Sequence, residues 1–148
     1  MRKVAVHALI ALATGGVMFT PVLCRAYELD PQLDCKSNAH DYISQLLNSQ
    51  YIEPNPMRVE ANSINAFRPI RGSNLTAFGF RVYAVLGYEH DDAIFRKGSG
   101  EPISDSAYGV VVNGPAETVE SRVREAGSGA IVKQVVPLLI TAILCDGR

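Results

Sequence analysis

The chain has 148 residues, of which 47% are hydrophobic and 20% charged, with 14 Lys and Arg against 15 Asp and Glu and a formal net charge of −1. This composition is typical of a globular chain long enough for one core. It lacks the basic excess that attracts nucleic-acid phosphates. We therefore expect one folded domain and no nucleic-acid partner.

The first 26 residues have the layout of a secretory signal peptide. Arg2 and Lys3 form a basic head, Val4–Phe19 is almost entirely apolar, and small side chains stand just before the expected cleavage point. Export machinery recognises this order of charged head, apolar middle and small-residue exit. The prediction is a signal peptide over residues 1–26 and a single exported domain over residues 27–148, located in the periplasm or secreted.

Two alternatives to cleavage remain open. The segment Val4–Leu23 is about as long as a bilayer span, so it could be retained as an anchor. Cys24 could instead carry a lipid, although the bulky Leu23 stands where lipoprotein signals prefer a small residue. The helix break at Pro21 favours cleavage after Ala26, and no membrane span is expected once the signal has been removed.

Cleavage leaves an even pair of cysteines, Cys35 and Cys145. In an oxidising compartment we expect this pair to form a disulfide that joins the start of the domain to its last strand. Closing a loop of about 110 residues stabilises a fold by about 4–5 kcal/mol in chain-entropy models. Two buried free thiols are the alternative, and two cysteines without paired histidines provide too few ligands for zinc. Cleavage also removes three of the 14 basic residues and no acidic one, so the net charge changes from −1 to −4.

A helix is the first element predicted after an extended lead-in. Ser37 or Asn38 can cap it, because a short polar side chain accepts bonds from the free N–H groups of a first turn. Four apolar residues follow at helical spacing: Tyr42, Ile43, Leu46 and Leu47. The prolines of "EPNP" end the helix, since each disfavours helical geometry in the residue before it.

Two strands with alternating apolar residues are predicted next, over 57–67 and, more clearly, over 75–88. Six apolar residues of the second strand are expected on one core-facing side: Phe78, Phe80, Val82, Ala84, Leu86 and Tyr88. The opposite side carries Arg81, Tyr83 and Val85. We expect that side to meet solvent or a partner.

The last third of the chain predicts a strand–helix–strand unit. "AYGVVV" is typical of a strand, and in the helix that follows Pro115 suits the first position and Gly127 the left-handed residue that ends it. Residues 130–145 then return as one strand, or as two segments bent at Pro137. Such a unit favours a right-handed crossover between parallel strands.

The predicted elements indicate an α+β fold. We expect a single small domain with a mixed, mainly antiparallel sheet, two helices on one face of it and a terminal strand–helix–strand unit. The order of the strands in the sheet stays open.

The sharpest polar cluster is "YEHDD", which contains Glu89, His90, Asp91 and Asp92. These residues could bind a divalent cation, or His90 could carry protons. Successive strand residues point to opposite faces, however, and paired aspartates are typical of turns, where they cap backbone N–H groups. Turn chemistry is therefore the favoured interpretation, and the short apolar run at 93–95 is expected to pair back as a hairpin.

His40 and Asp41 stand in the first turn of the first predicted helix. His40 could act as a general base beside His90 or an acid elsewhere, but the favoured interpretation is an exposed His40, with Asp41 complementing the helix dipole. No Gly-x-Ser-x-Gly nucleophile motif occurs, and Glu117 would repel an anion from the second helix. We predict no catalytic residue, no metal site, no cofactor and no small-molecule ligand.

The best candidate for a binding surface combines arginines with an aromatic residue. "FRPIRG" contributes Arg68 and Arg71, and the polar side of the long strand contributes Arg81 and Tyr83. Arginine and tyrosine are enriched in protein–protein hot spots. The alternative is a solvated loop beside a strand face that neighbouring elements cover.

These observations favour a small exported, non-enzymatic protein that binds another protein, in an inhibitor or immunity role. Two alternatives remain: a small envelope hydrolase that uses His90, Asp91 and Asp92, or His40, and an accessory subunit of an envelope assembly.

Overall fold

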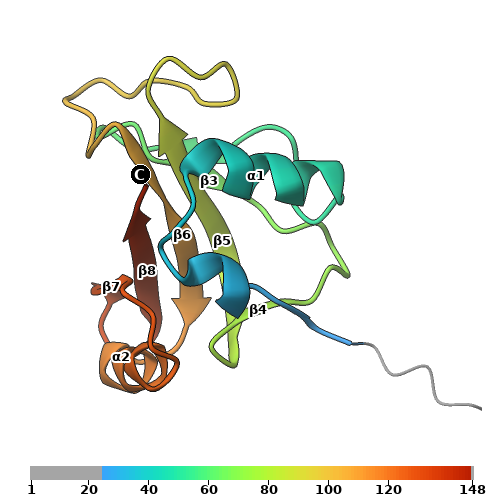
Figure 1. Cartoon of the computed structure of the whole chain (residues 1–148), viewed down its shortest axis with the longest axis vertical. Helices are drawn as coiled ribbons and strands as arrows, with labels where there is room; N and C mark the ends of the chain where they lie inside the picture. The colour runs from blue at the N-terminus through green and yellow to red at the C-terminus, as the bar shows by residue number, and fades with distance from the viewer. Residues whose placement is uncertain (1–24, 148) are drawn as a thin grey trace, which may run out of the picture.

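A computed structural model of the chain describes residues 25–147, which form an α+β domain (Figure 1). The predicted fold class is confirmed, whereas the predicted signal peptide lies outside the described residues except for Arg25 and Ala26. The elements in chain order are β1 (Tyr27–Glu28), the 3-10 helix η1 (Asp30–Leu33), α1 (Ala39–Asn48), β2 (Arg58–Val59), β3 (Asn65–Phe67), β4 (Leu75–Ala77), β5 (Phe80–Glu89), β6 (Ser106–Asn113), α2 (Ala116–Glu125), β7 (Ile131–Val136) and β8 (Ile140–Asp146).

The eight strands form one sheet, in which six strands follow the order β1-β4-β5-β6-β8-β7 and β2 and β3 lie off this path. Only β1 and β4 pair in parallel, and every other pairing among the described strands is antiparallel. The short strands β4 and β3 share the edge of β5 that β6 does not use, and β2 extends from β3. β7 pairs with β8 alone, so one edge of β7 has no partner strand within the described chain.

The predicted first helix is confirmed as α1, with Asn38 as its cap: the Asn38 side chain accepts a bond from the Asp41 N–H. Tyr42, Ile43 and Leu46 of the predicted stripe are buried against the sheet. A Cβ atom on Gly87 would lie 2.6 Å from Ile43 Cγ1, so a glycine at this position of β5 allows α1 to pack closely.

The second helix, α2, lies on the same side of the sheet as α1 (Figure 1). A Cβ atom on Gly114 would contact both Phe80 of β5 and Val119 of α2, which shows which side of β5 the helix covers. Pro115 is the residue before the helix rather than its first residue, one position from the prediction. Gly127 has φ +71° and ends the helix in the predicted left-handed conformation.

Residues 130–145 form two segments, one of the two predicted arrangements, but the chain reverses after Pro137 instead of bending. β7 and β8 form an antiparallel hairpin, and β8 lies between β6 and β7 in the sheet. β6 and β7 therefore run in the same direction without touching, so the expected crossover does not join neighbouring strands. The tight turn is the reason, because it lets the returning chain pair at once with the strand it has just left.

Two predicted strands are wrong in detail, since each is two strands joined by a turn. Residues 57–67 contain β2 and β3, which pair antiparallel. The strand predicted over 75–88 contains β4 and most of β5, and the chain reverses between them at Phe78 and Gly79. The φ angles of these two residues, 49° and 85°, are those of a two-residue hairpin turn. Residues 93–95 lie in a turn and not in a strand, so the hairpin predicted there is also wrong.

A β-bulge at Tyr83 changes which side chains of β5 face the helices. Val82 pairs with Val112 and Val85 with Val110, so one more residue stands on β5 than on β6 between these pairs. A bulge shifts the alternation by one residue, which places Val85 on the helix side together with Val82. Beyond Val82 the prediction of one shared side is therefore wrong: Ala84, Leu86 and Tyr88 point to the other side, although all three are buried in the core as expected.

The predicted disulfide is confirmed between Cys35 and Cys145, whose Cα atoms are 5.0 Å apart across a sequence separation of 110. It fastens the segment before α1 to β8. None of the helices in residues 25–147 has the length and apolarity needed to span a bilayer.

Candidate functional site

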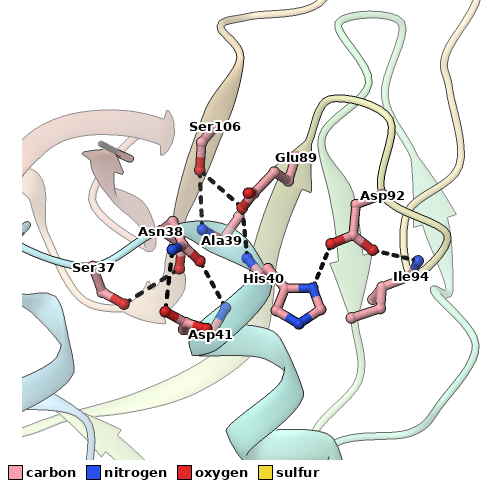
Figure 2. Close-up of polar contacts among 9 residues, drawn as sticks. All are labelled: Ser37, Asn38, Ala39, His40, Asp41, Glu89, Asp92, Ile94 and Ser106. Atoms are coloured by element: carbon pink, nitrogen blue, oxygen red, sulfur yellow. Dashed lines mark hydrogen bonds and ion pairs between the residues drawn. The ribbon is translucent and has the colours of Figure 1, made fainter.

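The first turn of α1 is held by polar groups from the sheet (Figure 2). The N–H groups at the start of a helix have no partners inside the helix, and here three of them have side-chain acceptors. The bonds are Ala39 N to Ser106 Oγ (3.0 Å), His40 N to Glu89 Oε2 (2.7 Å) and Asp41 N to Asn38 Oδ1 (2.8 Å). The next N–H, that of Tyr42, makes the first bond of the helix itself, to the Asn38 carbonyl at 3.2 Å. The carboxylate of Glu89 also complements the positive end of the helix dipole.

His40 forms an ion pair with Asp92, with 2.5 Å between Nδ1 and Oδ2. The hydrogen bond and charge of Asp92 raise the pKa of His40 above its ordinary value, and the charges of Asp41 and Glu89 act in the same direction. Asp92 in turn accepts a bond from the Ile94 N–H at 2.8 Å. The sequence allowed His40 to pair with His90 or with an acid elsewhere, and in the structure its partner is Asp92 of "YEHDD".

This cluster has one ingredient of general-base chemistry. A carboxylate on Nδ1 leaves Nε2 of an imidazole able to accept a proton, and in Figure 2 the Nε2 side of the His40 ring points away from the other residues drawn. Among the described residues, however, no hydroxyl or thiol is hydrogen-bonded to His40. The Ser106 hydroxyl bonds Ala39 and Glu89 instead. The bonds of Glu89 and Ser106 to the first turn of α1 fasten the helix to the end of β5 and the start of β6.

The remaining residues of "YEHDD" agree with the turn interpretation. Asp91 has φ +56°, and it forms exposed ion pairs with His90 at 3.2 Å and Lys97 at 3.8 Å. Within residues 25–147, no group of three or more His, Cys, Asp or Glu side chains is arranged to hold a metal ion.

All four residues of the predicted arginine and tyrosine surface are exposed. Arg81 and Tyr83 lie two residues apart on β5, Arg68 follows β3 directly, and Arg71 lies in the turn before β4. Within residues 25–147, no hydrogen bond, ion pair or ring contact joins the four side chains, and none of the three arginines forms an ion pair with another described residue. Their role in binding stays a prediction.

The side of β5, β6, β8 and β7 that faces away from the helices forms a second candidate surface, which we call the open face; its alanines Ala84, Ala107 and Ala142 are buried, and its exposed part lies mainly on β7 and the turn that follows. The pairing register places Val111 of β6 between Ala84 of β5 and Ala142 of β8, and Ala142 opposite Lys133 of β7. In the adjacent row, Leu144 of β8 lies opposite Ile131 of β7. Alternation along β5 places Arg81 on this side as well, and Tyr83 stands beside it in the bulge.

Exposed hydrophobic side chains concentrate on this part of the molecule. Eight large hydrophobic residues are exposed among the described residues. Six belong to the open face, to the edge strand β7 or to the turn that follows it, and a seventh, Ile103 in the loop between β5 and β6, lines a cavity together with Ile131 of β7. These seven are Tyr83, Ile103, Ile131, Val135, Val136, Leu138 and Leu139. Monomeric proteins rarely expose such clusters unless they bind a partner.

Leu138, in the turn between β7 and β8, is the most exposed of them. Its side chain is 77% exposed, and its φ angle of +62° lies in the left-handed region. That conformation costs an L-residue with a Cβ atom about 1–2 kcal/mol. Neither burial nor backbone preference explains a leucine here.

Sequence reasoning found Arg81 and Tyr83 of the open face and missed its hydrophobic residues. The run of apolar residues from Val135 to Leu139 was expected in one strand or in two segments bent at Pro137, but its exposure was not predicted, because only the sheet order shows that β7 is an edge. The chain gives no match to protein-family models, to curated protein sequences or to solved structures.

Proposed function

We propose that this protein is an exported, non-enzymatic protein that binds another protein through the open face and the turn between β7 and β8. The observation that carries the proposal is Leu138, which is 77% exposed in a left-handed conformation. Residues kept in strained conformations cluster at functional sites. A partner that covers Leu138 and the neighbouring side chains gives these exposed leucines, valines and isoleucines the burial they lack.

The location belongs to the same proposal. A disulfide between Cys35 and Cys145 is compatible with a compartment outside the cytoplasm, where such bonds persist. We place the protein in the periplasm or among secreted proteins, in an inhibitor or immunity role. The disulfide and the polar cluster at α1 both hold the helix side of the sheet together, which leaves the open face as a rigid platform for the partner.

Site-specific photo-crosslinking in the native envelope tests the proposal. A benzoylphenylalanine at Ile131 or at Leu138 should give a discrete crosslinked product that mass spectrometry identifies. The same group at Glu117, exposed on α2, is the matched control and should give none. Equal crosslinking at all three positions, or none at any, would contradict binding through the open face. A product that migrates with a large membrane complex would favour the accessory-subunit alternative.

A hydrolase is the second candidate, and the His40–Asp92 pair is the observation that favours it. If the cluster is catalytic, His40→Gln should abolish hydrolysis of a panel of ester and peptide substrates, while His90→Gln should leave it intact. Absence of turnover in the wild-type protein would remove this candidate.

A further inference from the structure

Two cations of the open face have no counter-ion. Neither Lys133 nor Arg81 forms an ion pair with another described residue. Three exposed arginines elsewhere, Arg68, Arg71 and Arg122, are also without an ion pair among the described residues, whereas Arg58 pairs with Glu60 and Arg124 with Glu120. The open face therefore presents unneutralised positive charge on both sides of its apolar centre.

A cavity of about 210 Å³ opens beside Lys133. Its apolar lining comes from three elements: Ile103 in the loop after β5, Ile131 on β7 and Leu144 on β8, with Ala107 of β6 behind them. Asp146, the acidic residue of β8, lines the same cavity. Pockets of this kind receive apolar anchor side chains at protein interfaces.

The charges argue against a second copy of this chain as the occupant. A two-fold contact places the same patch on both subunits, so two open faces would bring Arg81 and Lys133 of one copy onto the patch that carries them in the other. Like charges placed together across an interface are unfavourable. A polyanion such as nucleic acid also fits poorly, because the chain's own net charge is −1 and no basic stripe runs across the sheet.

We propose that the occupant is a protein whose contact surface carries carboxylates around an apolar side chain. The apolar side chain enters the cavity beside Leu144, and the carboxylates pair with Lys133 and Arg81. This inference rests on the proposed function and adds the chemistry of the partner to it.

Selection from a random-peptide phage library on the oxidised protein tests the inference. The selected peptides should share an apolar residue flanked by Asp or Glu. Binding of a synthetic peptide of that consensus, measured by fluorescence anisotropy, should weaken about tenfold or more in Lys133→Glu and in Arg81→Glu, as expected for charge reversal at an interface. Arg122→Glu is the matched control, because Arg122 is an exposed arginine of α2 that forms no ion pair with another described residue. The affinity of this variant for the peptide should equal that of the wild type.

A further variant, Ile131→Ser, separates this inference from the proposed function. If Ile131→Ser abolishes binding while both charge reversals leave it intact, the acidic partner is wrong and binding through the open face stands. If none of the variants affects binding, both proposals are wrong. A consensus without Asp or Glu overturns the inference. It is also overturned if sedimentation shows a dimer that Ile131→Ser dissociates. Unchanged circular dichroism and thermal midpoints confirm that the variants fold.

Discussion

His40 and Asp92 are separated by 52 residues in the chain, yet His40 Nδ1 lies 2.5 Å from Asp92 Oδ2. The pair joins the first turn of α1 to the loop after β5, next to the bond between the His40 N–H and Glu89. One histidine therefore contacts the sheet end through both its backbone and its ring. Because the ring can lose its proton, this junction depends on pH.

The folded protein should lose stability as the pH rises past neutrality. Asp92 raises the pKa of His40 above the ordinary 6.5, so the folded state binds the proton more tightly than the unfolded state. The stabilisation is complete below about pH 6.5 and is lost as the pH rises through the folded-state pKa. Urea midpoints from about pH 6 to about pH 9 should fall in the wild type and change less in His40→Gln.

His90 provides the control for that experiment. Its ion pair with Asp91 is exposed, with 52% of the His90 side chain and 76% of the Asp91 side chain accessible, so the interaction is weak. His90→Gln should therefore keep the wild-type pH dependence. A pH profile of His40→Gln that coincides with the wild type would show that the pair with Asp92 does not form in solution.

The cap of α1 should contribute measurably to stability. Asn38→Ala removes the acceptor of the Asp41 N–H and should lower the free energy of unfolding by about 1 kcal/mol, the usual effect of losing such a cap. Ser37→Ala is the neighbouring control, because the Ser37 hydroxyl makes only a 3.5 Å contact with the Asn38 carbonyl. Urea unfolding that gives the same loss for both variants would contradict the capping role.

The disulfide should provide a large part of the stability. Replacing both Cys35 and Cys145 with Ala frees a loop of 110 residues, and it should lower the free energy of unfolding by about 4–5 kcal/mol in chain-entropy models. The wild type should show a similar loss in reductant, while the double variant should not respond to reductant. A wild-type protein whose mass does not rise by about two daltons on reduction has no disulfide, and this result would contradict the pairing.

The parts of the fold that depend on local signals could be predicted from the sequence. The Asn38 cap, Gly127 and the alternation within β5 are such signals, and Cys35 could be paired with Cys145 once Cys24 was assigned to the expected signal peptide. The bulge at Tyr83 could not be predicted, because the alternation of β5 continues through it in the sequence. The turn at Phe78 and Gly79 was hidden for a related reason: apolar residues flank it on both sides.

The candidate sites depend on tertiary structure and were harder to predict. His40 meets Asp92 only because α1 begins close to the point where β5 ends. The open face exists only because β8 inserts between β6 and β7 and leaves β7 at an edge. A continuous apolar segment such as 135–140 is typical of a buried strand, so its exposure could not be derived from its residues.

Replacing Leu138 with asparagine should not destabilise the fold. Asparagine adopts left-handed conformations more readily than leucine does, so Leu138→Asn should leave the free energy of unfolding unchanged or raise it by up to about 1 kcal/mol. Leu139→Asn is the control, since Leu139 is 63% exposed and has no positive φ angle. It should show no gain. Both variants should weaken partner binding, and full binding by both would contradict a role for this turn.

The two glycines after α2 should respond differently to the same substitution. A Cβ atom at Gly127 or at Gly129 would touch nothing within 4 Å, so any difference between them comes from the backbone alone. Gly127 has φ +71° and Gly129 has no positive φ angle. Gly127→Ala should therefore lower the free energy of unfolding by about 1–2 kcal/mol, while Gly129→Ala should leave it unchanged or raise it by about 0.4–1 kcal/mol. Equal urea midpoints for the two variants would show that α2 does not end in a left-handed residue at Gly127.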